Sequence, residues 1–409
     1  MPDVSPLAPA SFPAMSPIAG VRLASYAAGI RYQGRDDVMV AELAPGSTIA
    51  GVFTQSTMPG QPVIWCRQCL PCGTVRAIVV NSGNANVFTG RAGWQVVEST
   101  AATAARLFSC EPREVYLSST GVIGEPPPAD RISDALPAIV GLLDAGAWEK
   151  AARAIMTTDT FPKGATATAT IGGTTVRING FCKGSGMIAP NMATMLAYLF
   201  TDAVLPAAVL QKLLAETNEV SFNSMTVDGD TSTSDTVLLC ATGQARSAPV
   251  ASAADPLVSG FRQALRSVMV DLAQQIARDG EGAQKFVTVD VTGAESDRAA
   301  RQIGLAIGNS PLVKTALAAG DANWGRIVMA VGKSGEKADR DKLGITIGGT
   351  QITGGGGPLP GYREGPVAEH MKGRAIHIAI DIGLGGGKAT VWTCDLTHGY
   401  IDINGSYRS

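Results

Sequence analysis

Short apolar runs and helical spacing divide this chain into strands and helices. Runs of about four to eight apolar or alternating residues predict strands. Apolar residues that recur three or four positions apart predict helices with one buried face. The predicted strands cover residues 38–43, 50–53, 75–80, 115–117, 165–171, 175–178, 286–291, 343–348, 375–382 and 389–395, and the predicted helices cover residues 92–108, 205–217 and 258–278.

The order of these elements indicates the fold class. Strands come in groups with helices between them, and strand and helix do not alternate strictly along the chain. Grouped strands indicate an α+β fold in which helices cover layered sheets. At 409 residues the chain can bury the core of two domains or of one large layered unit. We find no internal repeat and no clear linker in it.

Residues 183–195, Lys-Gly-Ser-Gly-Met-Ile-Ala-Pro-Asn-Met-Ala-Thr-Met, form the segment with the most unusual chemistry. An apolar run follows it, so Thr194 would begin a buried element. The Thr194 hydroxyl could attack the carbonyl carbon of Ala193, and hydrolysis of the resulting ester would leave Thr194 with a free α-amine. Such an amine, with an ordinary pKa of about 7.7–8.0, could act as the base for its own hydroxyl. Taken alone, the segment is explained more simply as a loop before a core strand.

Three further polar segments could belong to a site. Residues 81–86 follow a predicted strand and contain more amides than packing requires. Residues 118–124 form a predicted turn rich in hydroxyls and glycine, which could aim N–H groups at an oxyanion or be an ordinary turn. Residues 223–235 hold an Asp-x-Asp spacing but lack the later glutamate and flanking helices of a calcium loop, so we predict a loop that braces the site. Glu281 should project from the tight turn after the last predicted helix.

Composition and charge exclude several classes of protein. Lys and Arg number 33, Asp and Glu number 35, and the net charge of −2 gives no electrostatic support for binding nucleic acid or an anionic membrane. We find no charge-free apolar stretch of about 18 residues and no secretory signal, so a cytoplasmic protein is expected. An odd number of cysteines, seven, indicates reduced thiols.

Metal, nucleotide and histidine chemistry are weakly indicated. Cys66, Cys69 and Cys72 have metal-like spacing, but no fourth thiolate or histidine follows, and a structural zinc ion prefers four ligands. The glycine runs at residues 354–357 and 383–388 resemble phosphate loops, but the second enters a predicted strand where a phosphate loop needs a helix. No histidine has an evident nucleophile near it in sequence. We therefore predict no metal and no cofactor.

Several of these segments together resemble the ornithine acetyltransferases of bacterial arginine biosynthesis. Members of that family are bifunctional glutamate N-acetyltransferases and amino-acid acetyltransferases. Any one segment would be weak evidence, but together they are specific and run in family order over nearly the whole chain. The matching segments are residues 81–86, 118–124, 156–160, 183–195, 226–233, 278–283, 313–316, 323–326 and 394–397.

The resemblance implies a fold and a set of site residues. The fold would be an αββα sandwich of the N-terminal-nucleophile type. Self-cleavage between Ala193 and Thr194 would give an α chain, residues 1–193, and a β chain, residues 194–409, which stay together and assemble as α2β2 or larger. The resemblance places the nucleophile at Thr194, the oxyanion hole at Thr120 and Gly121, and substrate contacts at Thr157, Lys183, Thr194, Glu281, Asn404 and Ser409.

The implied reaction is a ping-pong acetyl transfer in arginine biosynthesis. Thr194 would take the acetyl group of N2-acetylornithine and pass it to glutamate, with Lys183 pairing with the substrate α-carboxylate and Glu281 facing the ornithine ammonium. Whether acetyl-CoA also serves as donor stays open. Two other functions remain open on the residues alone: a self-cleaving aminopeptidase or amidase with the same nucleophile, and an uncleaved scaffold or binding protein.

Overall fold

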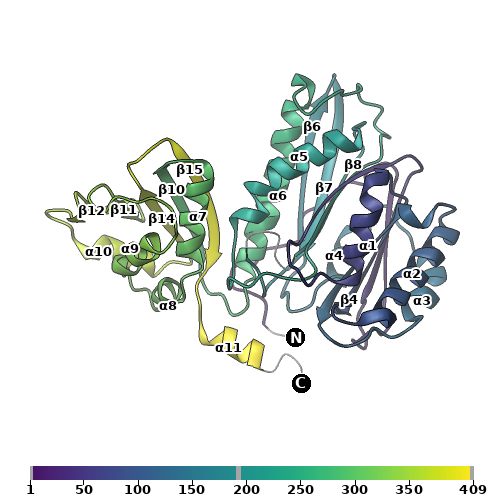
Figure 1. Ribbon diagram of the computed structural model, residues 1–409, viewed down its shortest axis with the longest axis horizontal. Coiled ribbons are helices and arrows are strands. Elements are labelled where there is room, and N and C mark those ends of the chain that lie inside the picture. The colour runs from purple at the N-terminus through teal and green to yellow at the C-terminus, as the bar shows by residue number, and fades with distance from the viewer. Residues whose placement is uncertain (1–2, 190–194, 406–409) are drawn as a thin grey trace.

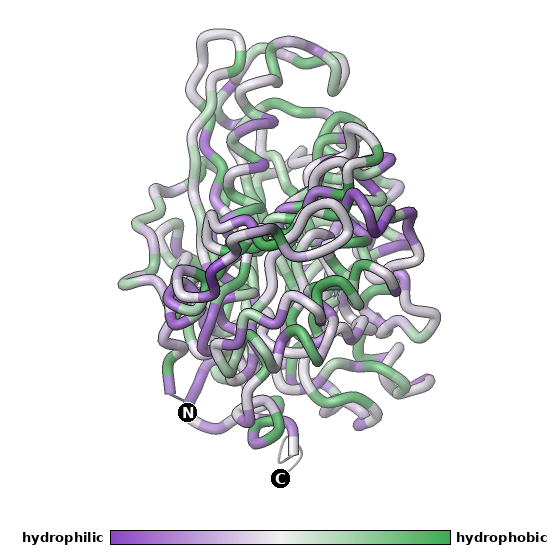
Figure 2. Tube along the Cα trace, turned by 90° about the vertical axis from the view of Figure 1, so that its left-hand side faces the viewer, coloured by the Kyte–Doolittle hydropathy of each residue, from purple (hydrophilic) through white to green (hydrophobic). Residues whose placement is uncertain are grey.

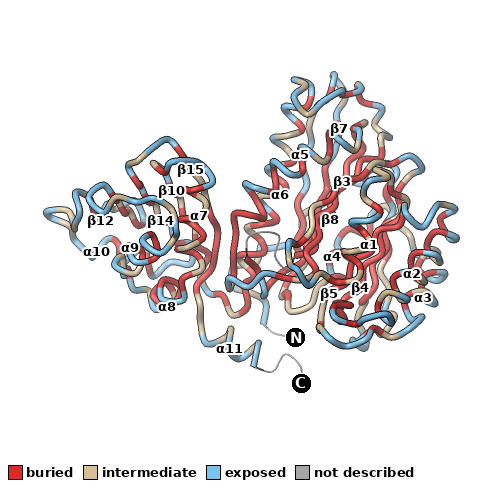
Figure 3. Tube along the Cα trace, viewed as in Figure 1, coloured by how far each residue is buried: buried red, intermediate tan, exposed pale blue. Residues whose placement is uncertain are grey.

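The computed structural model of the chain describes residues 3–189 and 195–405. The chain forms two lobes that lie side by side (Figure 1), a larger one of stacked sheets and a smaller one built around a single sheet. Buried residues follow the strands and the inner sides of the helices in both lobes (Figure 3). Among the described residues, no helix is long and apolar enough to cross a membrane.

Two sheets stack face to face in the larger lobe. Their facing sides share one apolar core, in which the Trp148 ring lies 5.7 Å from the Phe200 ring and 6.4 Å from the Phe181 ring. The four-stranded sheet has the order β1-β2-β4-β5, with β1 Val21–Tyr26, β2 Val38–Leu43, β4 Ala77–Asn84 and β5 Val115–Val122. The five-stranded sheet has the order β3-β9-β8-β7-β6, with β3 Thr48–Phe53, β6 Lys163–Ile171, β7 Thr174–Lys183, β8 Leu196–Thr201 and β9 Thr236–Ala241.

Helices cover the outer face of each stacked sheet. Helices α2 (Gly90–Leu107) and α3 (Arg131–Val140) share a core with the four-stranded sheet, and α5 (Ala207–Glu219) and α6 (Ser259–Arg278) share one with the five-stranded sheet. The layers therefore follow the order α, β, β, α, and the expected layered α+β fold of the αββα type is confirmed. Two further helices, α1 (Gln61–Cys69) and α4 (Trp148–Ala154), contribute to the core between the sheets.

The smaller lobe is a six-stranded sheet with helices packed on its apolar face. Val287, Val289 and Val291 of its strand β10 pack in one core with Ile303 of α7. The sheet has the order β13-β12-β11-β14-β10-β15, with β10 Phe286–Ala294, β11 Gly344–Ile347, β12 Thr350–Gly354, β13 Gly357–Pro358, β14 Ala375–Asp381 and β15 Gly387–Cys394. The helices of this lobe are α7 Asp297–Gly308, α8 Pro311–Ala319, α9 Trp324–Gly332 and α10 Glu364–Met371.

The last described helix, α11 (His398–Gly405), returns from the smaller lobe to the larger one (Figure 1). It lies at the same end of the molecule as the first described residues, and the view turned by 90° agrees (Figure 2). Ser5 also lies at that end of the molecule, because its hydroxyl donates to the Arg278 carbonyl at the end of α6 (2.7 Å). Both ends of the described chain thus lie near the end of α6.

Two segments predicted to be loops are strands in the structure, so both predictions are wrong. Residues 81–84 continue β4, and the expected turn after Leu117 continues β5 to Val122. Parallel pairing of β4 with β5 extends through Gly83 and Gly121, where the register then shifts. Gly121 has φ +133°, and a Cβ atom there would lie 2.3 Å from the Gly83 carbonyl carbon, so only glycine allows this approach. The glycine runs at 354–357 and 383–388 each lead from one strand to the next, so neither opens a helix as a phosphate loop would.

Replacing Leu265 with Ala should destabilise the larger lobe by about 2–5 kcal/mol, because this fully buried side chain of α6 fills the core against the five-stranded sheet. Urea denaturation followed by far-UV circular dichroism measures the change. Ser267→Ala, on the exposed side of the same helix, is the matched control and should stay within about 0.5 kcal/mol of wild type. Equal effects of the two substitutions would contradict this placement of α6.

Candidate active site

A cavity of about 640 Å³ lies where the ends of β5 and β7 meet the turn after α6 and helix α11. Strands of both stacked sheets contribute to its wall, and the last described helix closes one side. Of the nine residues that the sequence suggests for the site, the structure brings six together here. They are Thr120, Gly121, Thr157, Lys183, Glu281 and Asn404. Ala193, Thr194 and Ser409 lie outside the described residues.

Strand geometry aims Thr120 into the cavity. Successive side chains of a strand point to opposite faces, so Ser118 and Thr120 of β5 face the neighbouring sheet and Ser119 faces the outer helices. Thr120 is buried, and its hydroxyl oxygen lies 3.4 Å from the ammonium nitrogen of Lys183. Gly121 follows with a positive φ, next to the register shift.

Lys183, the last residue of β7, is 2% exposed and lines the cavity. Its ammonium group donates to the Thr157 hydroxyl at 2.7 Å and to the Thr120 hydroxyl at 3.4 Å. It also lies 3.8 Å from a carboxylate oxygen of Asp159. Burial lowers the pKa of Lys183 and the Asp159 charge opposes that change.

A chain of buried charges continues from Lys183 beneath the cavity. Lys163, fully buried, lies between Asp159 and Asp279 and donates to each at 2.6 Å. Burial disfavours the charges of Asp159 and Lys163, but their attraction outweighs it, so the pKa of Asp159 is lowered and that of Lys163 is raised. Asp159 also accepts the Gly184 N–H at 2.6 Å. Sequence reasoning assigned no role to these residues, although Asp159 and Asp279 fall within segments that carry the family resemblance.

Glu281 forms the opposite end of the cavity. It follows α6 in a turn and is 8% exposed, and its carboxylate accepts a hydrogen bond from the Asn404 amide of α11 at 2.6 Å. Burial raises the pKa of Glu281, and the Asp228 carboxylate adds to the increase. Gly186 packs directly against this carboxylate, since a Cβ atom at residue 186 would lie 2.3 Å from Glu281 Oε2.

Two further hydrogen bonds hold α11 in place, one to the same turn and one to Asp228 of the loop at residues 223–235. The Thr397 hydroxyl donates to the Gly282 carbonyl at 2.7 Å, and the Tyr400 hydroxyl donates to Asp228 at 3.3 Å. Gly282 can approach the start of α11 closely because it has no side chain. The end of the cavity that holds Glu281 is therefore assembled from the turn after α6 and from α11.

The acidic loop at residues 223–235 braces the site, as predicted. Asp228 accepts the N–H groups of Met187 (2.6 Å) and Ile188 (2.9 Å), and Asp235 accepts that of Met195 (2.9 Å). These bonds hold the chain on both sides of residues 190–194. Burial raises the pKa of Asp235 well above its ordinary value.

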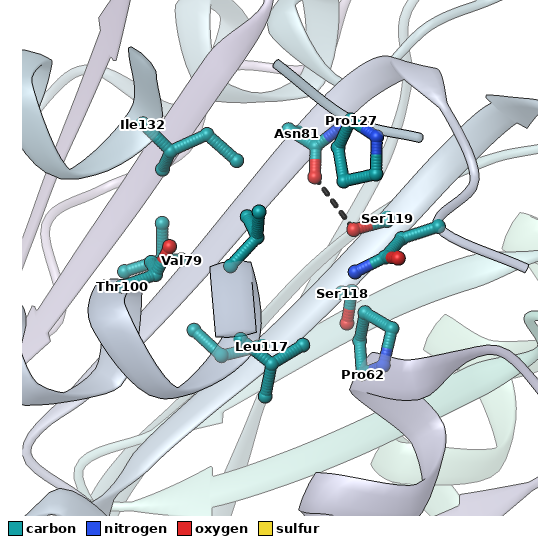
Figure 4. Close-up of a pocket in the computed structure, with 12 residues that line it drawn as sticks. Pro62, Val79, Asn81, Thr100, Leu117, Ser118, Ser119, Pro127 and Ile132 are labelled. Atoms are coloured by element: carbon teal, nitrogen blue, oxygen red, sulfur yellow. Dashed lines mark hydrogen bonds between the residues drawn. The ribbon is translucent and has the colours of Figure 1, made fainter. Parts of the chain in front are cut away.

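The asparagines of β4 and of the turn after it brace backbone rather than face the cavity, so their number does not mark a functional loop. The Asn81 amide donates to the Asn84 carbonyl (2.9 Å) and accepts from the Ser119 hydroxyl (2.6 Å; Figure 4). Asn86 donates to a backbone carbonyl of α2 (2.9 Å), and only Ala85 of this turn lines the cavity. Behind β5, a gap of about 20 Å³ lies between the strand and the outer helices (Figure 4), room for about one water molecule.

The remaining sequence candidates lie elsewhere. The Cys66 thiol, buried in α1, donates to the Leu117 carbonyl at 3.1 Å, and burial raises its pKa. Among the described residues, no three His, Cys, Asp or Glu side chains are placed to hold a metal ion. Residues 313–316 lie in α8 of the smaller lobe, where Lys314 donates to the Thr393 hydroxyl at 3.0 Å, and residues 324–326 begin α9, with Asn323 at its N-cap. No described residue of these two segments lines the cavity that holds Lys183.

Comparison with known proteins identifies the family. The ArgJ family matches residues 22–409. The arginine biosynthesis bifunctional protein ArgJ of Gluconobacter oxydans is 59% identical over 99% of this chain and 96% of its own, and that of Rhizobium meliloti is 54% identical over 100% and 99%. The crystal structure of ArgJ from Bacillus halodurans is 39% identical, covers 50% of this chain and 96% of its own, and has a TM-score of 0.49. The chain therefore belongs to the ArgJ family, the bifunctional acetyltransferases of arginine biosynthesis.

Proposed function

We propose that this protein cleaves itself between Ala193 and Thr194 and then transfers the acetyl group of N2-acetylornithine to glutamate through an acetyl-Thr194 intermediate. The observation that carries the proposal is the convergence of Thr120, Lys183 and Glu281 on one cavity. Leu196, two residues after Thr194, pairs with Lys183 across β7 and β8, so the chain returns to the cavity wall directly after the proposed nucleophile.

The sheet supports a cleaved but associated protein. The five-stranded sheet takes β3, β6 and β7 from residues 1–193 and β8 and β9 from residues 194–409. Backbone pairing of β7 with β8 and of β3 with β9 would hold the α and β chains together after the cut. We extend the proposal to an α2β2 assembly in the cytoplasm. All seven cysteines are free in the described structure, and thiols stay reduced in that compartment.

In the first half-reaction, Thr194 Oγ attacks the acetyl carbonyl carbon while the Thr194 α-amine accepts the hydroxyl proton. The Thr120 hydroxyl and the Gly121 N–H donate to the resulting oxyanion, and one such donor contributes roughly 2.7–4 kcal/mol. The oxyanion collapses, the bond from carbon to the ornithine nitrogen breaks, and the α-amine returns the proton to that nitrogen. The glutamate amine then attacks the acetyl ester in the same way and leaves as N-acetylglutamate.

The charges of the cavity fit an amino-acid substrate. Lys183 can pair with the α-carboxylate, and Glu281 can pair with the side-chain ammonium of ornithine. The relatives are named bifunctional, which supports acetyl-CoA as a second acetyl donor. A self-cleaving amidase with the same nucleophile would differ only in the acceptor. Water would attack the acetyl-Thr194 ester in place of glutamate, and acetate would be released instead of N-acetylglutamate.

Self-cleavage predicts two chains in the purified protein. Intact mass measured under denaturing conditions should give two species, the second beginning at Thr194, in place of one species of 42.1 kDa. Thr194→Ala should remove the nucleophile and leave the chain uncleaved and inactive, whereas Thr194→Ser should keep part of both activities. A fully active protein with an intact chain would refute the proposed nucleophile.

The proposed oxyanion hole predicts a loss of rate without a loss of binding. Thr120→Val removes the hydroxyl but keeps the shape of the side chain, so kcat should fall by roughly a hundred- to a thousandfold while KM for N2-acetylornithine changes little. Ser119→Ala, one residue away on the opposite face of β5, is the matched control and should retain kcat. Steady-state kinetics on the cleaved protein measures kcat and KM for both variants. Similar kcat values for Thr120→Val and wild type would remove Thr120 from the mechanism.

A further inference from the structure

The two substrates of the proposed reaction place opposite charges at the same position. Ornithine and glutamate share the α-carbon, and the side-chain nitrogen of one and the side-chain oxygens of the other are each four bonds from it. In a ping-pong reaction both amino acids must present the α-nitrogen to the same nucleophile. If Lys183 holds both α-carboxylates, an ammonium and a carboxylate meet the Glu281 end of the cavity in turn.

Glu281 is packed too tightly to turn away from a carboxylate. Gly186 lies against it, since a Cβ atom there would be 2.3 Å from Oε2, and the Asn404 amide donates to Oε2 at 2.6 Å. A buried carboxylate cannot face another carboxylate at short range unless one of them takes a proton. Protonation is therefore the change open to Glu281 when glutamate binds.

We propose that Glu281 discriminates between the two substrates by its protonation state. It is ionised when it faces the ornithine ammonium and protonated when it donates a hydrogen bond to the glutamate side-chain carboxylate. One proton enters the cavity with glutamate and leaves when ornithine is bound, so the complete cycle consumes none. This proposal rests on the proposed function and deepens it.

The groups around Glu281 make this exchange accessible. Burial and the Asp228 carboxylate favour the protonated acid, whereas the Asn404 amide, the Thr158 hydroxyl and the Lys183 ammonium favour the carboxylate. Burial is the largest of these effects, and the pKa of Glu281 is raised from its ordinary value of 4.5. The side-chain ammonium of bound ornithine would lower the pKa of Glu281 again, and the side-chain carboxylate of bound glutamate would raise it further. Tyr400 of α11 also lies beside Glu281, and burial raises its pKa, so it stays neutral.

Calorimetry of ligand binding tests the proposal without catalysis. Ornithine and glutamate carry the same α-groups, so a difference in proton exchange reports on the side-chain end of the cavity. Wild-type protein is titrated with each amino acid in two buffers of different ionisation enthalpy, slightly above the ordinary glutamate pKa. Glutamate should take up protons and ornithine should release them. Exchange of the same sign for both ligands, or no exchange, would overturn the proposal.

Glu281→Gln gives the second test, because a neutral amide can face either side chain without titrating. The variant should lose proton exchange with both ligands, bind ornithine roughly ten- to a hundredfold more weakly, and bind glutamate within a few-fold of wild type. Asp230→Asn removes an exposed carboxylate nearby and should leave both exchanges intact. If Glu281→Gln weakens glutamate and ornithine equally, the protonation role is wrong.

The proposed function fails independently of this result. Wild-type protein that binds both amino acids with opposite proton exchange, but never carries an acetyl group on Thr194 when given N2-acetylornithine, would refute the transfer mechanism and leave the role of Glu281 intact. Conversely, acetyl-Thr194 together with proton exchange of one sign would retain the transferase and refute the protonation role.

Discussion

The buried charge chain from Lys183 through Asp159 and Lys163 to Asp279 is the constraint on which the site depends. Each ion in such a place costs several kcal/mol of lost hydration, which only close pairing offsets, and losing one partner leaves the other charge uncompensated. The 2.6 Å contacts on both sides of Lys163 meet that requirement. Because this row of buried charges is stable only when all four groups are in place, it sets the positions of the segments that carry them.

Those segments are the ones that line the cavity. Asp159 accepts the N–H groups of Thr157 and Gly184, so it joins the segment before β6 to the end of β7. Asp279 accepts from Thr160, and its carbonyl accepts from the Ser185 hydroxyl, which places Glu281 two residues further on. A single ionic structure thus fixes the spacing between Lys183, at one end of the cavity, and Glu281, at the other.

The sequence predicted the elements whose periodicity is strong and missed those whose contacts are distant. Helix α2 and the β6–β7 hairpin follow from local spacing. The end of β5 does not, because its hydroxyls and Gly121 resemble a turn until pairing with β4 satisfies the backbone. Helix α7 was also missed, although Ala300, Ile303 and Ile307 recur at helical spacing and form its buried face. The Lys163–Asp279 pair joins residues 116 positions apart, and no local pattern reports such a contact.

The two ends of the cavity differ in how firmly the fold holds them. Lys183 lies at the buried end of β7 and contacts a buried ionic chain. Glu281 depends for its amide donor on α11, a helix in which no described residue is buried and which hydrogen bonds hold to the larger lobe. Local stability follows buried apolar contact, so α11 is among the least stable helices. The end of the cavity that would bind the α-carboxylate, which both substrates share, is rigid. The end that would bind the side chains, in which the substrates differ, rests on α11, the helix with the least packing. A site that must accept two side chains of opposite charge in each cycle therefore changes only where the substrates differ, and the change proposed there is the protonation of Glu281.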